Sequence, residues 1–293
     1  MLYLVASIVC SVLVSVLLKI ARKQKIPIEQ AVAVNYIVAI TLTMLVLKPD
    51  LSDPMQFLPT WWLFVALGVL LPTVFVIMGK AVDSAGIVKS DAAQRLSLFL
   101  PIVASFAIFG DQLTEGRLIG IALAFVALFC LLWKSDGSKK SGSLSTQIGL
   151  LFGVWVGYGV IDILFKQVAK SGTAFAGNLL VAFCLAAILM FAYLFSKGTK
   201  WTKEGIIGGI LLGGLNFLNI VTYISAHRAM NDNPTLVFAG MNMGVIVLGT
   251  IVGAWIFKEK ISSINAAGIS VALVAIACLF YWEQIRSFVA MLG

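Results

Sequence analysis

The sequence predicts an all-α integral membrane protein with ten transmembrane helices, arranged as two inverted five-helix repeats. Of its 293 residues, 60% are hydrophobic and 12% are charged, and the mean hydropathy is +1.03. A soluble domain carries about 25% charged residues, so water is not the solvent for most of this surface. Several apolar runs also reach the roughly 20 residues that cross about 30 Å of hydrocarbon. The third observation is an internal repeat.

One stretch of the chain occurs twice, at residues 109–133 and at residues 257–281. FGDQLTEGRLIGIALAFVALFCLLW aligns without a gap with FKEKISSINAAGISVALVAIACLFY, and Gly120 falls on Gly268. A match at a fixed period indicates that one half of the chain is a copy of the other. The predicted parts are a first repeat, a polar linker and a second repeat: 1–133, 134–146 and 147–293.

Each half contains five apolar segments. The expected spans are 2–20, 28–47, 61–79, 84–109, 114–133, 147–168, 174–195, 205–228, 233–257 and 261–282. We expect Pro101 to bend the fourth span and Pro72 to bend the third, because proline lacks the backbone N–H and its ring clashes with the preceding turn. A duplicated unit with an odd number of spans must be inverted relative to its partner, which is the plan of many secondary transporters.

The charges of the loops predict the orientation. The first, fifth, seventh and ninth loops carry eleven Lys or Arg residues, whereas the even loops and the C-terminal tail carry five. Because basic loops stay in the cytoplasm, we expect both termini outside the cytoplasm, in a protein that crosses the cell (inner or plasma) membrane several times. The net charge of +8 therefore reflects orientation, and we expect no nucleic acid partner.

Cysteine spacing and catalytic motifs argue against cofactors. Cys10, Cys130, Cys184 and Cys278 all lie in apolar runs without C-x-x-C spacing, so neither a disulfide framework nor a zinc site is expected. The sequence also contains no nucleotide-binding loop and no Ser/His/Asp arrangement. We therefore expect no cofactor, no metal and no enzymatic activity.

The sixth span carries the clearest candidate site. Trp155, Tyr158, Asp162 and Lys166 follow one another at the spacing of one helix face. Charged side chains in hydrocarbon cost about 2.5–3.5 kcal/mol at a helix centre, so Asp162 is expected to face a cavity and carry a coupling proton or bind a substrate cation. The alternative is a packing stripe in which Asp162 pairs with Lys166. In the first repeat Lys19 takes the place of Lys166.

The eighth span repeats this spacing with polar residues. Asn216, Asn219, Tyr223 and His227 lie on one predicted face, and the first three are candidate substrate contacts. Asn amides are costly in lipid unless they are hydrogen-bonded. Hydrogen bonds between helices are the alternative to a binding role. His227 is expected at the level of the headgroups, with a proton relay as the alternative.

The fourth span begins with a charged segment. Asp91 and Arg95 are four residues apart, with Gln94 on the same face, and the repeat places Gln94 on Asn242. An amide at both equivalent positions favours a central, substrate-lining position. Asp91 and Arg95 would then gate the cavity, or Arg95 would bind a carboxylate or phosphate. The alternative is an interfacial ion pair.

Five plus five helices and the twice-occurring pattern F-[GK]-[DE]-x-[LI]-[TS]-x5-G resemble the drug/metabolite transporter superfamily, specifically its EamA-like permeases. Asp111 stands where that family usually has Glu, and Lys258 stands where it has Gly. The resemblance implies export or exchange of small metabolites by alternating access, through a central cavity lined by the first, third and fourth helices of each half.

The expected function is therefore a secondary active transporter of a small metabolite. Its substrate would be an amino-acid-like, drug-like or other small polar or amphipathic solute, moved in exchange with a proton or a counter-substrate. The lipid bilayer is the expected second partner. The alternative is a membrane-embedded scaffold or enzyme without a transport cycle, which would have no use for an inverted repeat.

Overall fold

The computed structural model describes residues 1–52, 54–85, 87–132, 144–258 and 263–292. The described chain is all-helical, as the sequence predicts. Its elements, apart from the fourth predicted span and short turns, are α1 (Leu2–Lys23), α2 (Ile28–Leu42), α3 (Trp61–Ala85), α6 (Glu115–Leu132), α7 (Leu144–Lys170), α8 (Phe175–Ser196), α9 (Lys203–Ala229), α10 (Pro234–Phe257) and α11 (Ser263–Leu292). A π-helical turn, η1 (Thr43–Leu47), extends α2.

Seven helical segments in the described part are long and apolar enough to cross a membrane. They are Leu2–Lys23, Ile28–Leu47, Leu58–Ala85, Leu144–Lys170, Phe175–Ser196, Lys203–Ala229 and Pro234–Ile256. Ala93–Ala107 and Ala266–Trp282 are shorter apolar helices. The chain is therefore a helical, multi-pass membrane protein.

The chain forms two compact units. Unit 1 comprises Met1–Gly79 and Val160–Ala229, and unit 2 comprises Lys80–Gly159 and Met230–Gly293. Each unit takes helices from both halves of the sequence, so the compact units differ from the predicted repeats. The division into repeats at 134–146 concerns the duplication of the sequence and stays a prediction; the linker itself lies almost wholly outside the described residues.

The fourth predicted span is broken into two helices, which is where the structure departs from a single segment. α4 (Ile87–Leu96) and α5 (Phe99–Ala107) meet at Ser97 and Leu98. Pro101 has no N–H to donate to the carbonyl four residues earlier, and that carbonyl, of Ser97, instead accepts from the backbone N of Leu100 at 3.0 Å. The expected effect of Pro101 is thus confirmed. The same effect was expected of Pro72, but α3 continues through Pro72 as one helix.

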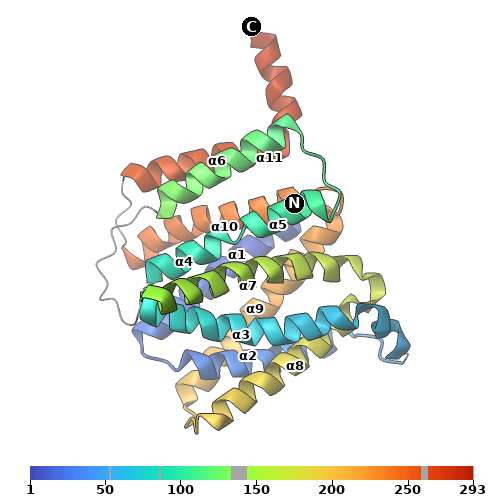
Figure 1. The fold of residues 1–293 in the computed structure, drawn as a ribbon, viewed down its shortest axis with the longest axis vertical. Coiled ribbons are helices and arrows are strands. Elements are labelled where there is room, and N and C mark those ends of the chain that lie inside the picture. The colour runs from blue at the N-terminus through green and yellow to red at the C-terminus, as the bar shows by residue number, and fades with distance from the viewer. Residues whose placement is uncertain (53, 86, 133–143, 259–262, 293) are drawn as a thin grey trace. The chain divides into compact units, whose positions relative to one another are not determined.

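The two copies of the repeated stretch, α6 and α11, pack against each other within unit 2 (Figure 1). A Cβ atom on Gly116 would lie 2.2 Å from Cγ of Trp282, and one on Gly120 would lie 2.6 Å from Cγ of Leu279. Real Cβ atoms do not approach so closely, so both positions need glycine. Small residues four apart allow helices to approach in this way.

A second glycine row fixes α9 on α2 within unit 1. Gly205, Gly209 and Gly213 are four residues apart and meet successive turns of α2. A Cβ on Gly209 would lie 2.8 Å from the backbone oxygen of Ala31, and a Cβ on Gly213 would lie 3.0 Å from that of Asn35. The backbones of α2 and α9 are therefore in direct contact along this row.

Candidate functional site

A cluster of ionisable and aromatic side chains lies inside unit 1, between α7 and α9. Lys166 is fully buried, and its Nζ donates a hydrogen bond to the backbone oxygen of His227 at 3.4 Å. His227 is also fully buried, and its ring meets the ring of Tyr223 edge-on at 4.8 Å. Asp162, one turn before Lys166, is half-buried and interacts electrostatically with the Tyr223 hydroxyl. Phe165 packs edge-on against Tyr223, with the two ring centroids 6.2 Å apart.

The helical spacing read from the sequence explains this arrangement. Residues three and four apart share a helix face, so α7 presents Asp162 and Lys166 together and α9 presents Tyr223 and His227. The sequence assigned His227 to the headgroup level, but the structure buries it beside Lys166. His227 lies in the last turn of α9, so its expected position at the level of the headgroups stays a prediction. Its burial against neighbouring helices is a feature that helix length alone does not reveal.

The amides of α9 bind neighbouring helices of unit 1. Asn216 Nδ2 donates to Asn35 Oδ1 at 3.1 Å, and Ser7 Oγ donates to Asn219 Oδ1 at 2.8 Å. These contacts are the inter-helix hydrogen bonds that were the alternative to a binding role. Both amides remain half-buried, and their contact with substrate stays a prediction.

The remaining predicted residues of α7 lie in unit 2. Trp155 Nε1 donates to the backbone oxygen of Leu96 at 3.0 Å, so its indole satisfies a carbonyl at the break between α4 and α5. Gly159 lets α7 approach the same break, because a Cβ there would lie 3.0 Å from the backbone oxygen of Ser97. Tyr158 is half-buried on the same helix. Trp155 thus supports the break, a role that its residue type did not predict.

The other predicted residues are dispersed over three helices. Gln94 and Arg95 are half-buried on α4, and the side chain of Asp91 lies outside the described part. Asn242 Nδ2 donates to the backbone oxygen of Phe238, on its own helix, at 3.0 Å. Lys19 is exposed near the end of α1. The structure therefore brings together Asp162, Lys166 and Tyr223, which all belong to unit 1. The other predicted site residues of α4, α10 and the first part of α7 belong to unit 2.

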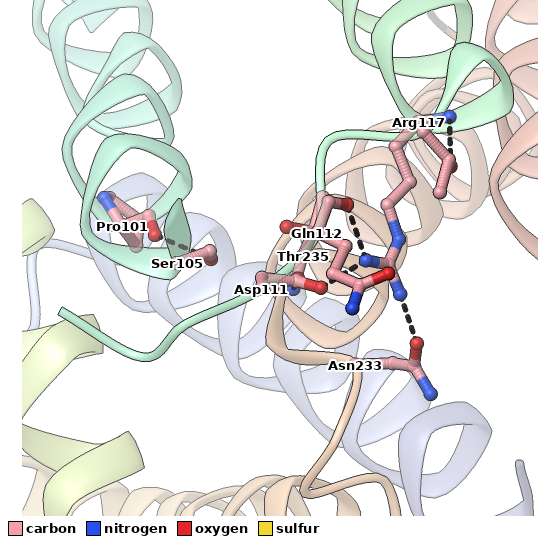
Figure 2. A network of polar contacts seen from close by, with 8 residues as sticks. Pro101, Ser105, Asp111, Gln112, Arg117, Asn233 and Thr235 are labelled. Atoms are coloured by element: carbon pink, nitrogen blue, oxygen red, sulfur yellow. Dashed lines mark hydrogen bonds and ion pairs between the residues drawn. The ribbon is translucent and has the colours of Figure 1, made fainter. Parts of the chain in front are cut away.

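A second polar cluster, in unit 2, joins the turn before α6 to the start of α10 (Figure 2). The fully buried Asp111 carboxylate pairs with Arg117 and accepts the backbone N–H of Thr235 at 3.1 Å. Arg117 also donates to the side-chain oxygen of Asn233 and, at 2.6 Å, to the backbone oxygen of Gln112. We refer to Asp111, Arg117, Asn233 and Thr235 as the turn clamp.

The turn clamp caps α10 from a distant part of the chain. α10 begins at Pro234 without a side-chain cap of its own, so its first N–H groups lack acceptors within the helix. Asp111 supplies a negative charge and an acceptor at this positive helix end. Sequence reasoning singled out Asp111 through the repeated pattern but gave no sign of Arg117 or Asn233. In the sequence, the ion pair was indicated only by the position of Asp111 six residues before Arg117.

The helices and the buried ionisable clusters define the class: a polytopic α-helical membrane protein with charged groups inside its spans. No family model matches the chain. An uncharacterized protein of Haemophilus influenzae is 57% identical over 287 residues, which cover 96% of this chain and 98% of that protein. The chain belongs to the same protein family as this H. influenzae protein.

A solved structure described as a crystal structure of a protein is similar over almost the whole chain. The TM-score is 0.71 at 15% identity, covering 96% of this chain and 98% of the other. At that identity the likeness shows the fold, and it shows that this helical arrangement occurs in a crystal structure.

Proposed function

We propose that this protein is a secondary active transporter of a small metabolite, with ten membrane-spanning segments in two inverted repeats. The observation that carries the proposal is the cluster of Asp162, Lys166 and Tyr223 within candidate spans of unit 1. Ionisable side chains in a membrane interior are costly, and they typically mark substrate or ion pathways. A fully buried lysine on such a span is the strongest instance in the described chain.

The contacts between loops support ten crossings rather than seven. Side chains at two helix ends can touch only on the same face of the membrane, so an even number of crossings must separate them. Glu29 pairs with Lys197 at 3.0 Å, and Thr60 Oγ1 donates to Asn178 Oδ1 at 3.0 Å. With ten spans these pairs are separated by six and four crossings.

Two further contacts test the shorter helices. Asp111 contacts Thr235, and Glu115 lies 3.7 Å from Arg286. If α6 did not cross, the first pair would be separated by three crossings and lie on opposite faces. If α6 crossed but the α4–α5 segment did not, Thr60 and Asn178 would be on opposite faces. If α11 did not cross, Glu115 and Arg286 would lie on opposite faces of the membrane and could not touch. Ten crossings satisfy all four contacts, and five per half is the odd number that inversion requires.

In this mechanism Asp162 exchanges a coupling proton or binds the cationic part of the substrate, and Tyr223 lies beside it. Lys166 provides the counter-charge one turn away on α7, so that the cluster as a whole is close to neutral inside the bilayer. The half-buried Asn216 and Asn219 offer amide groups to a polar substrate.

A thermal-shift screen of the detergent-purified protein against a metabolite library tests the proposal. A ligand at about 100 times its Kd stabilises the state that it binds by roughly 2.7 kcal/mol. We expect a stabilising ligand whose effect disappears in Asp162→Asn and persists in Asp83→Asn, which makes the same chemical change at an exposed carboxylate of α3. A hit that survives Asp162→Asn would move the site elsewhere, and a screen without hits would favour the scaffold or enzyme.

A further inference from the structure

Two turns at the same end of unit 1 gather an exposed basic surface. The first turn connects α1 to α2, and the second connects α8 to α9. Their exposed basic residues are Arg22, Lys23, Lys25, Lys197, Lys200 and Lys203. We refer to this set as the two-turn basic surface.

Gln30, on α2, holds the two turns together. Its side chain is 2% exposed, and its Nε2 donates to the backbone oxygen of Lys200 at 2.6 Å. Its Oε1 accepts from the backbone N of Thr202 at 3.0 Å and from the Thr202 hydroxyl at 3.1 Å. Gly205 makes this fit possible, because a Cβ there would lie 2.5 Å from Oε1 of Gln30. The buried amide thus fixes the backbone that carries Lys200 and Lys203 beside the first turn.

Within the described part of the chain, Glu29 and the exposed Glu204 are the acidic residues next to these six basic residues, so the surface keeps an excess of positive charge. Lys197 pairs with Glu29 at 3.0 Å, but the other five basic residues make no ion pair with any described residue. Lys25 lies at the very tip of the first turn, in a left-handed conformation with φ of 56°. An excess of fixed positive charge therefore faces outward from these turns.

The apolar residues beside the charges match the edge of a bilayer. Phe195, near the end of α8, is 89% exposed, and Trp201 is 44% exposed and stacked on Phe191 at 5.5 Å. Aromatic side chains of this kind concentrate at the level of the lipid headgroups. A ligand with a charged head and an apolar tail would contact both kinds of residue, whereas a free anion would contact the basic residues alone.

We propose that the two-turn basic surface is a binding site for the headgroup of an anionic phospholipid. Basic groups held together at the ends of membrane helices attract anionic headgroups. Gln30 makes this a built site rather than a collection of loop charges, since it sets where Lys200 and Lys203 lie. The proposal requires only that α1, α2, α8 and α9 span the membrane, and it is independent of transport.

The test measures binding of the purified full-length protein to fluorescent phosphatidylglycerol in detergent micelles, with phosphatidylcholine as the neutral probe. Lys200→Gln/Lys203→Gln should weaken phosphatidylglycerol binding by roughly 10- to 30-fold. The matched control, Lys139→Gln/Lys140→Gln, removes the same charge from the 134–146 linker and should change binding by less than about twofold. Added salt should weaken the wild-type binding because it screens exposed charges.

Gln30→Ala is the decisive variant, because it keeps every charge and removes the contact between the turns. It should weaken phosphatidylglycerol binding several-fold with phosphatidylcholine binding unchanged. Where Gln30→Ala does not fold, Thr202→Val removes one of the contacts on Oε1 and should act in the same direction. Equal losses in the Lys200/Lys203 and linker variants would overturn the proposal, as would unchanged binding in the correctly folded Gln30 or Thr202 variant. Full displacement by an equal concentration of inorganic phosphate would show a free-anion site instead.

Discussion

The turn clamp offers the sharpest test of how this structure is stabilised. Arg117 is 14% exposed and pairs with Asp111, whose side chain is fully buried. In Arg117→Gln the carboxylate keeps the Thr235 N–H but loses its cationic partner. Removing one partner of a buried ion pair costs about 3–5 kcal/mol, because an uncompensated charge remains in a poorly solvated place.

A second ion pair involving the same helix, α6, provides the matched control. Arg286 and Glu115 lie 3.7 Å apart, but their side chains are 67% and 73% exposed. Water already solvates both charges, so Arg286→Gln should cost no more than about 1 kcal/mol. The two variants make the same chemical change, and the difference between them isolates the effect of burial.

Thermal unfolding of the detergent-purified variants measures the difference. For chains of 150–250 residues, 1 kcal/mol shifts the unfolding midpoint by about 2–4 °C, so Arg117→Gln should lower it by roughly 6 °C or more and Arg286→Gln by less than about 4 °C. Asp111→Asn/Arg117→Gln should recover part of the loss, because the stranded charge is gone. Midpoints of Arg117→Gln and Arg286→Gln within about 2 °C of each other would refute the reasoning.

Two further predictions concern unit 1. Gly209→Ala should destabilise the protein by about 1–3 kcal/mol in thermal unfolding, because the added methyl group would meet a backbone carbonyl of α2. The control Gly214→Ala places its methyl group in open space and should be neutral or up to about 1 kcal/mol stabilising. Equal effects of the two variants would disprove the contact. Tyr193 and Glu29 raise the pKa of Lys197 above its ordinary value of 10.5. The contribution of Lys197 to the stability of the fold is therefore complete below about pH 10.5 and is lost as the pH rises through the raised pKa. The thermal unfolding midpoints of Lys197→Gln and of the wild type should then converge at alkaline pH. A difference between the two midpoints that widens at alkaline pH would contradict this prediction.

The sequence predicted the elements of the fold better than their ends and interruptions. Helices of the described chain occupy the predicted spans, because hydropathy over about 20 residues is a property that each segment carries by itself. Pro101 indicated an interruption of the fourth span, since the missing N–H is local to the residue, but Pro72 gives the same signal and α3 continues through it. The spacing of Gly116 and Gly120 is typical of close helix packing but does not name α11 as the partner, and the equally regular row at Gly209 and Gly213 was not singled out.

The candidate site was predictable in part, for a related reason. Helical spacing placed Asp162 and Lys166 on one face of α7, and likewise Tyr223 and His227 on α9. Spacing could not show that these two faces meet, nor that Trp155 would bind a carbonyl of the α4–α5 break. Which helices become neighbours depends on the packing of the whole chain.

The sequence by itself determined that the chain is a helical membrane protein, because composition and hydropathy are summed along the chain. The ten spans and the duplication are predictions that the sequence also makes. Tertiary structure alone decided the partners. Asp111 caps a helix that begins 123 residues later, and Gln30 fixes a turn about 170 residues away. Each such contact satisfies a buried polar group that has no local solution, and buried polar groups must find partners wherever packing brings them. Those partners appear only once the helices are folded together.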